Sequence, residues 1–104
     1  MQISTSETIA GKEIAQTLGI ARGSTVRTRN IGRDFLAGLK NIVGGEIQGY
    51  TKLLADARES ALERMIKDAE SMGADAVVNV RISTSAVMQG AAEILAYGTA
   101  VKLQ

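Results

Sequence analysis

Few residue types in this sequence could carry acid–base, nucleophilic or metal chemistry, because histidine and cysteine are both absent. Their absence excludes Ser-His-Asp arrangements, imidazole general bases, thiolate nucleophiles and the usual zinc ligand sets. A catalytic centre would have to consist of Asp, Glu, Lys, Arg, Tyr, Ser and Thr side chains. No spacing of these residues indicates one, so we expect a protein without enzymatic activity. An enzyme that acts on a charged metabolite through carboxylate and arginine side chains is a less favoured alternative.

Carboxylates outside the predicted solvent-exposed helix face are the candidate ligands for a metal ion. They are Glu7, Glu13, Glu46, Asp75 and Glu93. Carboxylate oxygens suit magnesium, calcium or manganese better than soft metals. Their spacing makes no site within one chain, which argues against a metal site. The sequence indicates no particular cofactor.

The glycines Gly44 and Gly45, followed by Glu46, precede a predicted helix and form a candidate anion site. Free backbone N–H groups and the helix dipole favour anions at a helix N-terminus. The alternative is a tight turn in which Glu46 itself complements the dipole. We favour the turn, because neither a phosphate-loop lysine nor a GxGxxG pattern accompanies the glycines.

Three charged residues after the predicted long helix complete the candidates. Asp75 follows a helix stop, where its carboxylate is expected to accept hydrogen bonds from backbone N–H groups of the turn. Arg81 and Glu93 lie on strands predicted to be neighbours, so we expect a cross-strand ion pair. Tyr97 is expected to pack rather than to act in catalysis. The predicted ligand-binding residues are therefore Gly44, Gly45, Glu46, Asp75, Arg81 and Glu93.

A cluster of arginines near the end of the first third of the chain could contact phosphates. It consists of Arg22, Arg27, Arg29 and Arg33. The net charge of the chain is only +1, and its aromatic residues are one phenylalanine and two tyrosines. Such a chain has neither the field nor the stacking groups typical of nucleic-acid or membrane binding. We expect solvated or inter-subunit ion pairs, and neither nucleic acid nor a membrane as partner.

The element that must organise these candidates is a long helix predicted over Glu46–Met72. Its apolar residues recur at intervals of three and four, which places them on one face of a helix. They are Tyr50, Leu53, Leu54, Ala57, Ala61, Leu62, Met65, Ile66 and Ala69. A shorter helix is predicted from Ile31 to Ile42, with Gly44–Gly45 as its stop.

The segments before and after the helices predict strands. Gln2–Ser4 is short and extended, and Gly11 marks a turn. Lys12–Arg22 fits a helix or a strand almost equally well, and a β-rich stretch follows at Ser24–Thr28. Internal glycines favour two separate strands here.

The C-terminal third predicts a hairpin. After a helix stop at Gly73, one strand face is formed by Val78, Val80, Ile82 and Thr84. A loop at Ser85–Gly90 leads to a last strand over Glu93–Leu103. The 104 residues make one domain, residues 1–104. The predicted class is α+β, a mainly antiparallel sheet with two helices on a face, in the order β-β-β-α-α-β-β.

Four strings of residues together resemble the YbjQ-type family of small bacterial and archaeal proteins of unknown function. They are Asn30–Gly38, Ile42–Glu46, Gly73–Val78 and Tyr97–Val101. The resemblance covers essentially the whole chain. It implies an α+β fold related to the dodecin subunit, a strand at Lys12–Arg22, and a homopentameric ring in which the sheets of neighbours meet.

The resemblance implies no activity and no catalytic residues. Members of the family are often labelled "putative heavy-metal-binding", which fits this chain poorly because soft metals prefer thiolate or imidazole ligands. Dodecins stack flavin on an aromatic residue, and we do not transfer flavin binding to a chain without tryptophan. We expect a non-enzymatic homo-oligomer, with a small-ligand or metal-binding module between subunits as the alternative. No segment has the length of a membrane span and no signal pattern opens the chain, so we expect a cytoplasmic protein.

Overall fold

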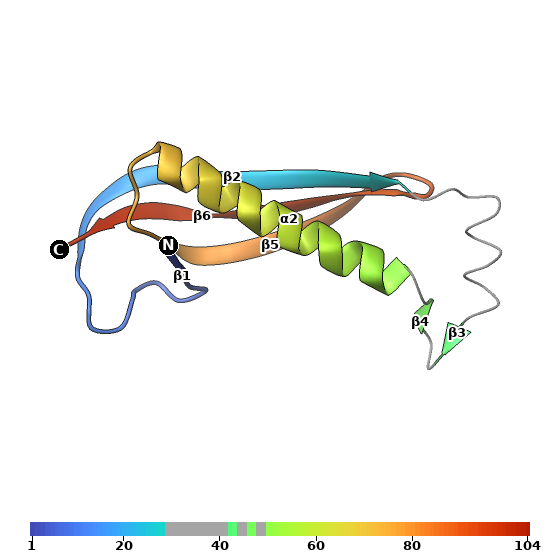
Figure 1. Cartoon of the computed structure of the whole chain (residues 1–104), viewed down its shortest axis with the longest axis horizontal. Helices are drawn as coiled ribbons and strands as arrows, with labels where there is room; N and C mark the ends of the chain where they lie inside the picture. The colour runs from blue at the N-terminus through green and yellow to red at the C-terminus, as the bar shows by residue number, and fades with distance from the viewer. Residues whose placement is uncertain (29–41, 44–45, 48–49) are drawn as a thin grey trace.

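The computed structural model of the protein describes residues 1–28, 42–43, 46–47 and 50–104, and the side chains of residues 1–28 and 52–104. Its elements are β1 (Gln2–Ile3), β2 (Ile14–Thr28), β3 (Ile42–Val43), β4 (Glu46–Ile47), α2 (Tyr50–Ser71), β5 (Ala76–Met88) and β6 (Ala91–Leu103). Three long strands and one long helix dominate the described part of the chain (Figure 1). The fold class is α+β.

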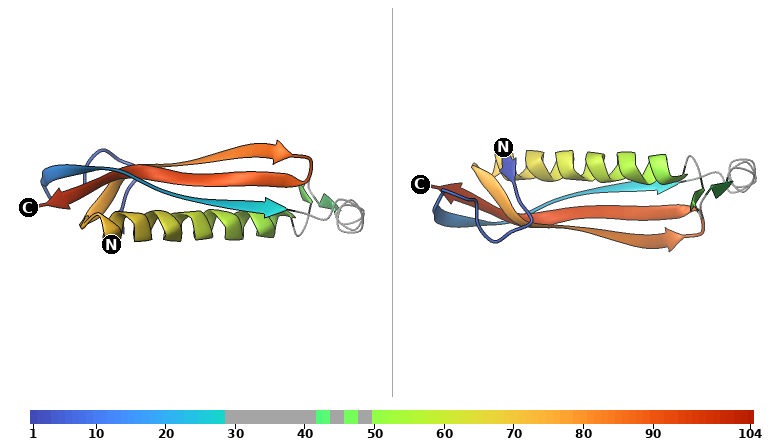
Figure 2. Two further views of the ribbon diagram at one scale, coloured as in Figure 1. Left: turned by 90° about the horizontal axis from the view of Figure 1, so that it is seen from above. Right: turned by 90° about the horizontal axis from the view of Figure 1, so that it is seen from below.

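The long strands form a mixed sheet in the order β1-β5-β6-β2. β6 is central and antiparallel to both β5 and β2, whereas the short β1 runs parallel to β5. β3 and β4 form a separate antiparallel pair. The views in Figure 2 show α2 along one side of the sheet, while the N-terminal segment crosses the other side near one end. We call the rest of that second side, around Ile20, Arg22, Leu95 and Tyr97, the uncovered face.

The helix packs through small side chains. Ala57, Ala61, Met65 and Ala69 recur every four residues and have no exposed surface. Opposite them, Gly23 of β2 allows close contact, since a Cβ atom there would lie 2.3 Å from the backbone N of Met65. The buried side of the sheet adds Ala21, Val77, Val80, Ile94, Ala96 and Ala100. This cluster is the main core.

A second, smaller core lies under the N-terminal segment. Ile9 is 3% exposed and packs with Ala76, Val78 and Val101. Gly11 has φ 75° and the Lys12 N–H donates to the Ile9 carbonyl, which confirms the predicted turn.

The predicted order β-β-β-α-α-β-β is wrong, because β3 and β4 stand between β2 and the helix, and the described residues contain a single helix. The helix begins at Tyr50 and not at Glu46, since Glu46 and Ile47 pair with Val43 and Ile42. β-branched residues favour such pairing. Ile42, the predicted end of a first helix, belongs to β3; the rest of that helix, from Ile31 on, lies outside the described residues. The predicted stop at Gly73, φ 81°, is confirmed.

The N-terminal strands also differ from the prediction. The stretch from Ile14 to Thr28 is one continuous strand rather than two. Gly23 does not interrupt it, because its missing side chain makes room for the helix backbone. Strand rather than helix at Lys12–Arg22 is confirmed from Ile14 onward.

The C-terminal hairpin is confirmed, with a shorter connection than predicted. Ser85–Met88 belong to β5, and only Gln89 and Gly90 separate Met88 from Ala91. Gly90 has φ 78°, as a tight hairpin turn requires. Val78 lies on a different side from Val80, because the register shifts between Val78 and Arg81 at Asn79, whose φ is 54°.

Candidate functional site

Asp75 is a structural carboxylate that joins the start of β5 to the end of β6. Its Oδ2 accepts a hydrogen bond from the backbone N–H of Leu103 at 2.9 Å, and its Oδ1 lies 3.4 Å from Lys102 Nζ. The Leu103 N–H, and secondarily the Lys102 charge, lower the pKa of Asp75 below its ordinary value, although desolvation opposes them. The predicted hydrogen bonds to N–H groups of the turn are replaced by this contact with β6.

The predicted ion pair between Arg81 and Glu93 is wrong. Glu93 lies opposite Ser85 of β5 and Val26 of β2, whereas Arg81 lies opposite Tyr97. Arg81 Nη1 donates instead to the carbonyls of Thr5 and Val80, each at 2.9 Å. An Arg81–Glu93 pair would need a hairpin centred on residue 87, but the turn lies at residues 89–90.

The predicted site residues do not come together. Asp75 contacts Leu103, which is ten residues along β6 from Glu93, a separation of roughly 30 Å in an extended strand. Gly44 and Gly45 lie outside the described residues, and Glu46 belongs to β4, four residues before the helix begins. A helix N-terminus at Glu46, on which the predicted anion site depended, is therefore absent.

A hollow on the uncovered face is the site that the sequence did not predict. It has a volume of about 210 Å³ and is lined by Ile20, Arg22, Leu95 and Tyr97. Arg22 lies directly opposite Tyr97 in the β2–β6 pairing, and Arg81 lies opposite Tyr97 on the other neighbouring strand. Tyr97 is 38% exposed, so its ring is accessible rather than packed in the core. The alternation of side chains along β6 is visible in the sequence. Which residues of β2 and β5 face them depends on the register of strand pairing.

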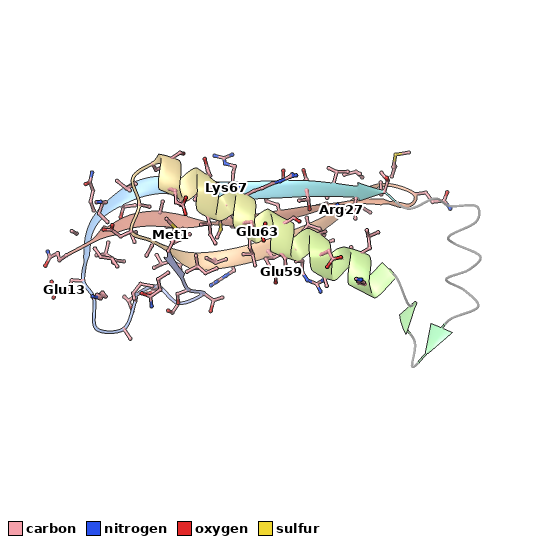
Figure 3. All side chains as sticks on the ribbon, in the orientation of Figure 1. Met1, Glu13, Arg27, Glu59, Glu63 and Lys67 are labelled. Atoms are coloured by element: carbon pink, nitrogen blue, oxygen red, sulfur yellow. The ribbon has the colours of Figure 1, made fainter. Side chains whose placement is uncertain are left out.

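The predicted arginine cluster does not form one surface, because Arg22 lines the hollow whereas Arg27 contacts the helix. Glu59, Glu63 and Lys67 lie along α2, and Arg27 lies on the neighbouring β2 (Figure 3). Arg27 Nη2 donates to Ser60 Oγ at 3.2 Å, which places this arginine against the helix. Arg29 and Arg33 lie outside the described residues. Most charged residues of α2 are exposed, as predicted, but Arg64 and the half-buried Asp68 bind backbone groups of β2 rather than forming salt pairs in solvent.

The donor set does not fit a soft metal. Among the side chains that the structure describes, no three carboxylates lie close enough to hold a metal ion. The whole chain lacks the histidine and cysteine that soft metals prefer. In the same described part, no helix is both long and apolar enough to cross a membrane.

Comparison with known proteins identifies the family. A family model described as "Putative heavy-metal-binding", of the YbjQ type, matches residues 1–104. The chain belongs to this YbjQ-type family. A UPF0145 protein of Methanosarcina acetivorans is 63% identical over 99% of this chain and 97% of its own length. A UPF0145 protein of Halorubrum lacusprofundi is 58% identical over 100% of both chains.

A solved structure supports the fold. The crystal structure of a protein of unknown function from Pediococcus pentosaceus aligns with a TM-score of 0.64, covering 100% of this chain and 98% of that one. The two sequences are only 16% identical, so the match concerns the fold alone. The family description names heavy metals, and the described residues of this chain supply no soft ligand set for them.

Proposed function

We propose that this protein is a non-enzymatic subunit of a cyclic homo-oligomer of five copies that acts in the cytoplasm. The ring and its size come from the resemblance to the YbjQ-type family and the dodecin subunit. The observation in this structure that supports self-association is the open edge of β5.

The outer edge of β5 has few partners among the described residues. β1 pairs only with Ala76 and Val77, and the Val80 N–H donates to the Ser4 carbonyl. From Arg81 to Met88 every residue of β5 is exposed. An exposed edge of this length is a template for pairing with another chain, and soluble proteins normally protect such edges.

The same part of β5 also exposes apolar side chains. Ile82, Val87 and Met88 are exposed by 42%, 54% and 68%. Together with backbone groups of the same strand that no described residue pairs, they offer both hydrogen-bonding groups and apolar area to a second copy. Burying them on assembly would contribute about 25 cal/mol for each Å² removed from water.

The opposite edge of the sheet is protected by the chain itself. The Arg22 N–H donates to Asp68 Oδ2 at 3.0 Å, and the Ser24 carbonyl accepts a hydrogen bond from Arg64 Nη1 at 2.6 Å. Side chains of α2 therefore occupy backbone groups of β2 that a neighbouring strand would need. A ring joins two different patches of adjacent subunits, so the β5 edge would meet another surface of the neighbour rather than its own copy.

Light scattering at micromolar concentration tests the proposal. We expect a single species of five subunits, and a monodisperse monomer would contradict self-association. Ala86→Lys places a charge on the β5 edge and should shift the mass towards monomer while circular dichroism shows a folded chain. Ala10→Lys, at an exposed alanine away from this edge, is the matched control and should leave the mass unchanged.

A single introduced cysteine distinguishes a ring from a two-fold dimer. The chain has no cysteine of its own, so Ser85→Cys can form a disulfide only between copies. In a ring, the introduced thiols of adjacent subunits are held apart and oxidation should leave monomers on a denaturing gel. A rapid and complete covalent dimer would indicate edge-to-edge pairing of β5 with itself and would contradict the ring.

A further inference from the structure

The hollow on the uncovered face combines one cationic group with an apolar lining. Its walls are the side chains of Ile20, Leu95 and Tyr97, and its charged residue is Arg22. The pairing of Arg22 with Tyr97 places both side chains on the same side of neighbouring strands. A guanidinium beside a phenol ring is suited to a ligand that carries both an anion and a flat apolar body.

The Arg22 guanidinium is available, whereas the backbone of the same residue is fixed. Its N–H group is held by Asp68 Oδ2 at 3.0 Å. Across residues 1–28 and 52–104, the single ion pair joins Lys102 to Asp75, far from the hollow along β6. The backbone of Arg22 is thus held in place, and no carboxylate among the described side chains lies within ion-pair distance of its guanidinium.

The surroundings of the hollow favour an anion over a cation. Arg81 flanks Tyr97 from the other neighbouring strand, with Nη1 engaged by the Thr5 and Val80 carbonyls. Among the described residues, no carboxylate lines the hollow, and Glu93, which shares its side of the sheet, lies four residues from Tyr97, about 13 Å along the strand. Arg22 and Arg81, the two residues paired directly with Tyr97, are therefore both nearer to it in the sheet than Glu93 is.

We propose that this hollow binds a small molecule with a single carboxylate or phosphate group on a flat apolar ring. The ring would lie against Tyr97 and Leu95, and the anion would accept hydrogen bonds from the Arg22 guanidinium. The volume is adequate, because a cavity of about 150 Å³ accommodates benzene and the hollow measures about 210 Å³. The site lies within one chain and does not depend on the proposed ring.

Titration with defined probes, followed by amide resonances of the assembled protein, tests this site. Phenyl phosphate and benzoate carry both an anionic group and an aromatic ring, and we call them the two-feature probes. Inorganic phosphate carries only the anion, and phenol carries only the ring. We expect either two-feature probe to shift the amides of Ile20, Arg22, Leu95 and Tyr97, and to bind at least tenfold more tightly than both single-feature probes. Equal binding of inorganic phosphate, or no shift at these residues with phenyl phosphate or benzoate, would overturn the proposal.

Substitutions test whether Arg22 binds the anionic group and Tyr97 binds the ring. Arg22→Gln should weaken the two-feature probes about tenfold, because a charge-assisted hydrogen bond is replaced by a neutral one. Arg58→Gln, at an exposed arginine on α2, removes the same charge elsewhere and should leave the affinity unchanged. Tyr97→Leu should weaken phenyl phosphate while leaving the weak inorganic phosphate affinity as it is. Equal losses in the Arg22 and Arg58 variants would reduce the effect to net charge and overturn the site.

Discussion

Arg81 of β5 lies directly opposite Tyr97 of β6, on the side of the sheet away from α2. The turn at Gln89–Gly90 sets this register, and Arg22 of β2 faces Tyr97 from the other side. Two arginines thus flank one exposed aromatic ring, although they are far apart in the sequence. The same register separates Arg81 from Glu93 by about four residues along the sheet, which excludes the ion pair suggested by their strands.

The register predicts that Arg81 and Glu93 act independently. In a double-mutant cycle with Arg81→Gln and Glu93→Gln, the two changes in unfolding free energy should add within about 0.5 kcal/mol. Urea unfolding at one fixed protein concentration measures all four variants. A coupling energy above about 1 kcal/mol would mean that the side chains meet and that the register is different.

The contact between α2 and β2 predicts a severe effect at Gly23. In Gly23→Ala the new Cβ atom would lie 2.3 Å from Met65 N and 2.5 Å from the Ala61 carbonyl oxygen, both backbone atoms that cannot rotate away. We expect a loss of unfolding free energy of about 3 kcal/mol, at the upper end of the usual cost of overpacking. Urea unfolding checks it, with Ser24→Ala on the exposed side of the same strand as control. A Gly23→Ala variant as stable as that control would contradict the close packing.

A buried hydroxyl predicts a smaller effect. Thr25 is 3% exposed, and its Oγ1 donates to the Ala57 carbonyl at 3.2 Å. Thr25→Val keeps the shape but loses this hydrogen bond, so the unfolding free energy should fall by about 1 kcal/mol. The same substitution at the exposed Thr28 is the control and should change stability by less than about 0.5 kcal/mol. Equal values for both variants would show that the hydroxyl contributes nothing to the packing of α2 on β2.

The helix and the last strand could be predicted because their side chains repeat, whereas the sequence predicts β2 as two strands and the end of β5 as a loop. The four-residue recurrence of Ala57, Ala61, Met65 and Ala69 is a property of the helix alone, and these residues are buried as predicted. The start of the helix could not be placed, since an acidic residue after two glycines resembles an N-terminus even when Glu46 pairs in β4.

The candidate site could not be predicted, because it depends on which residues of different strands face each other. Alternation assigns Arg22 and Tyr97 each to a side of its own strand, but no turn joins β2 to β6, so the sequence does not fix which of their residues face each other. The pairing of β2 with β6 also shifts between Ile14 and Gln16 and again between Thr17 and Gly19. Gly90 indicates the turn of the β5–β6 hairpin, and this prediction is confirmed, but no residue pattern gives the register of β2 against β6.

Asp75 predicts a pH dependence of stability. Its pKa is lowered in the folded protein by the Leu103 N–H and the Lys102 charge, so the folded state binds this proton less readily than the unfolded chain. The stabilisation is therefore complete above the unfolded pKa of about 4, and it is lost as the pH falls through the lower folded value. Asp75→Asn should lower the melting temperature at pH 7, and less than Gly23→Ala does, because the carboxylate is solvent-exposed.

Thermal unfolding between pH 7 and pH 2.5 separates the charge of Asp75 from its shape. The difference in melting temperature between the wild type and Asp75→Asn should stay constant down to about pH 4 and shrink below it. Lys102→Gln removes only the weaker, exposed partner, whose Nζ lies 3.4 Å from the carboxylate, and should reproduce a minor part of the effect. A difference that persists unchanged to pH 2.5 would show that Asp75 acts through its shape rather than its charge.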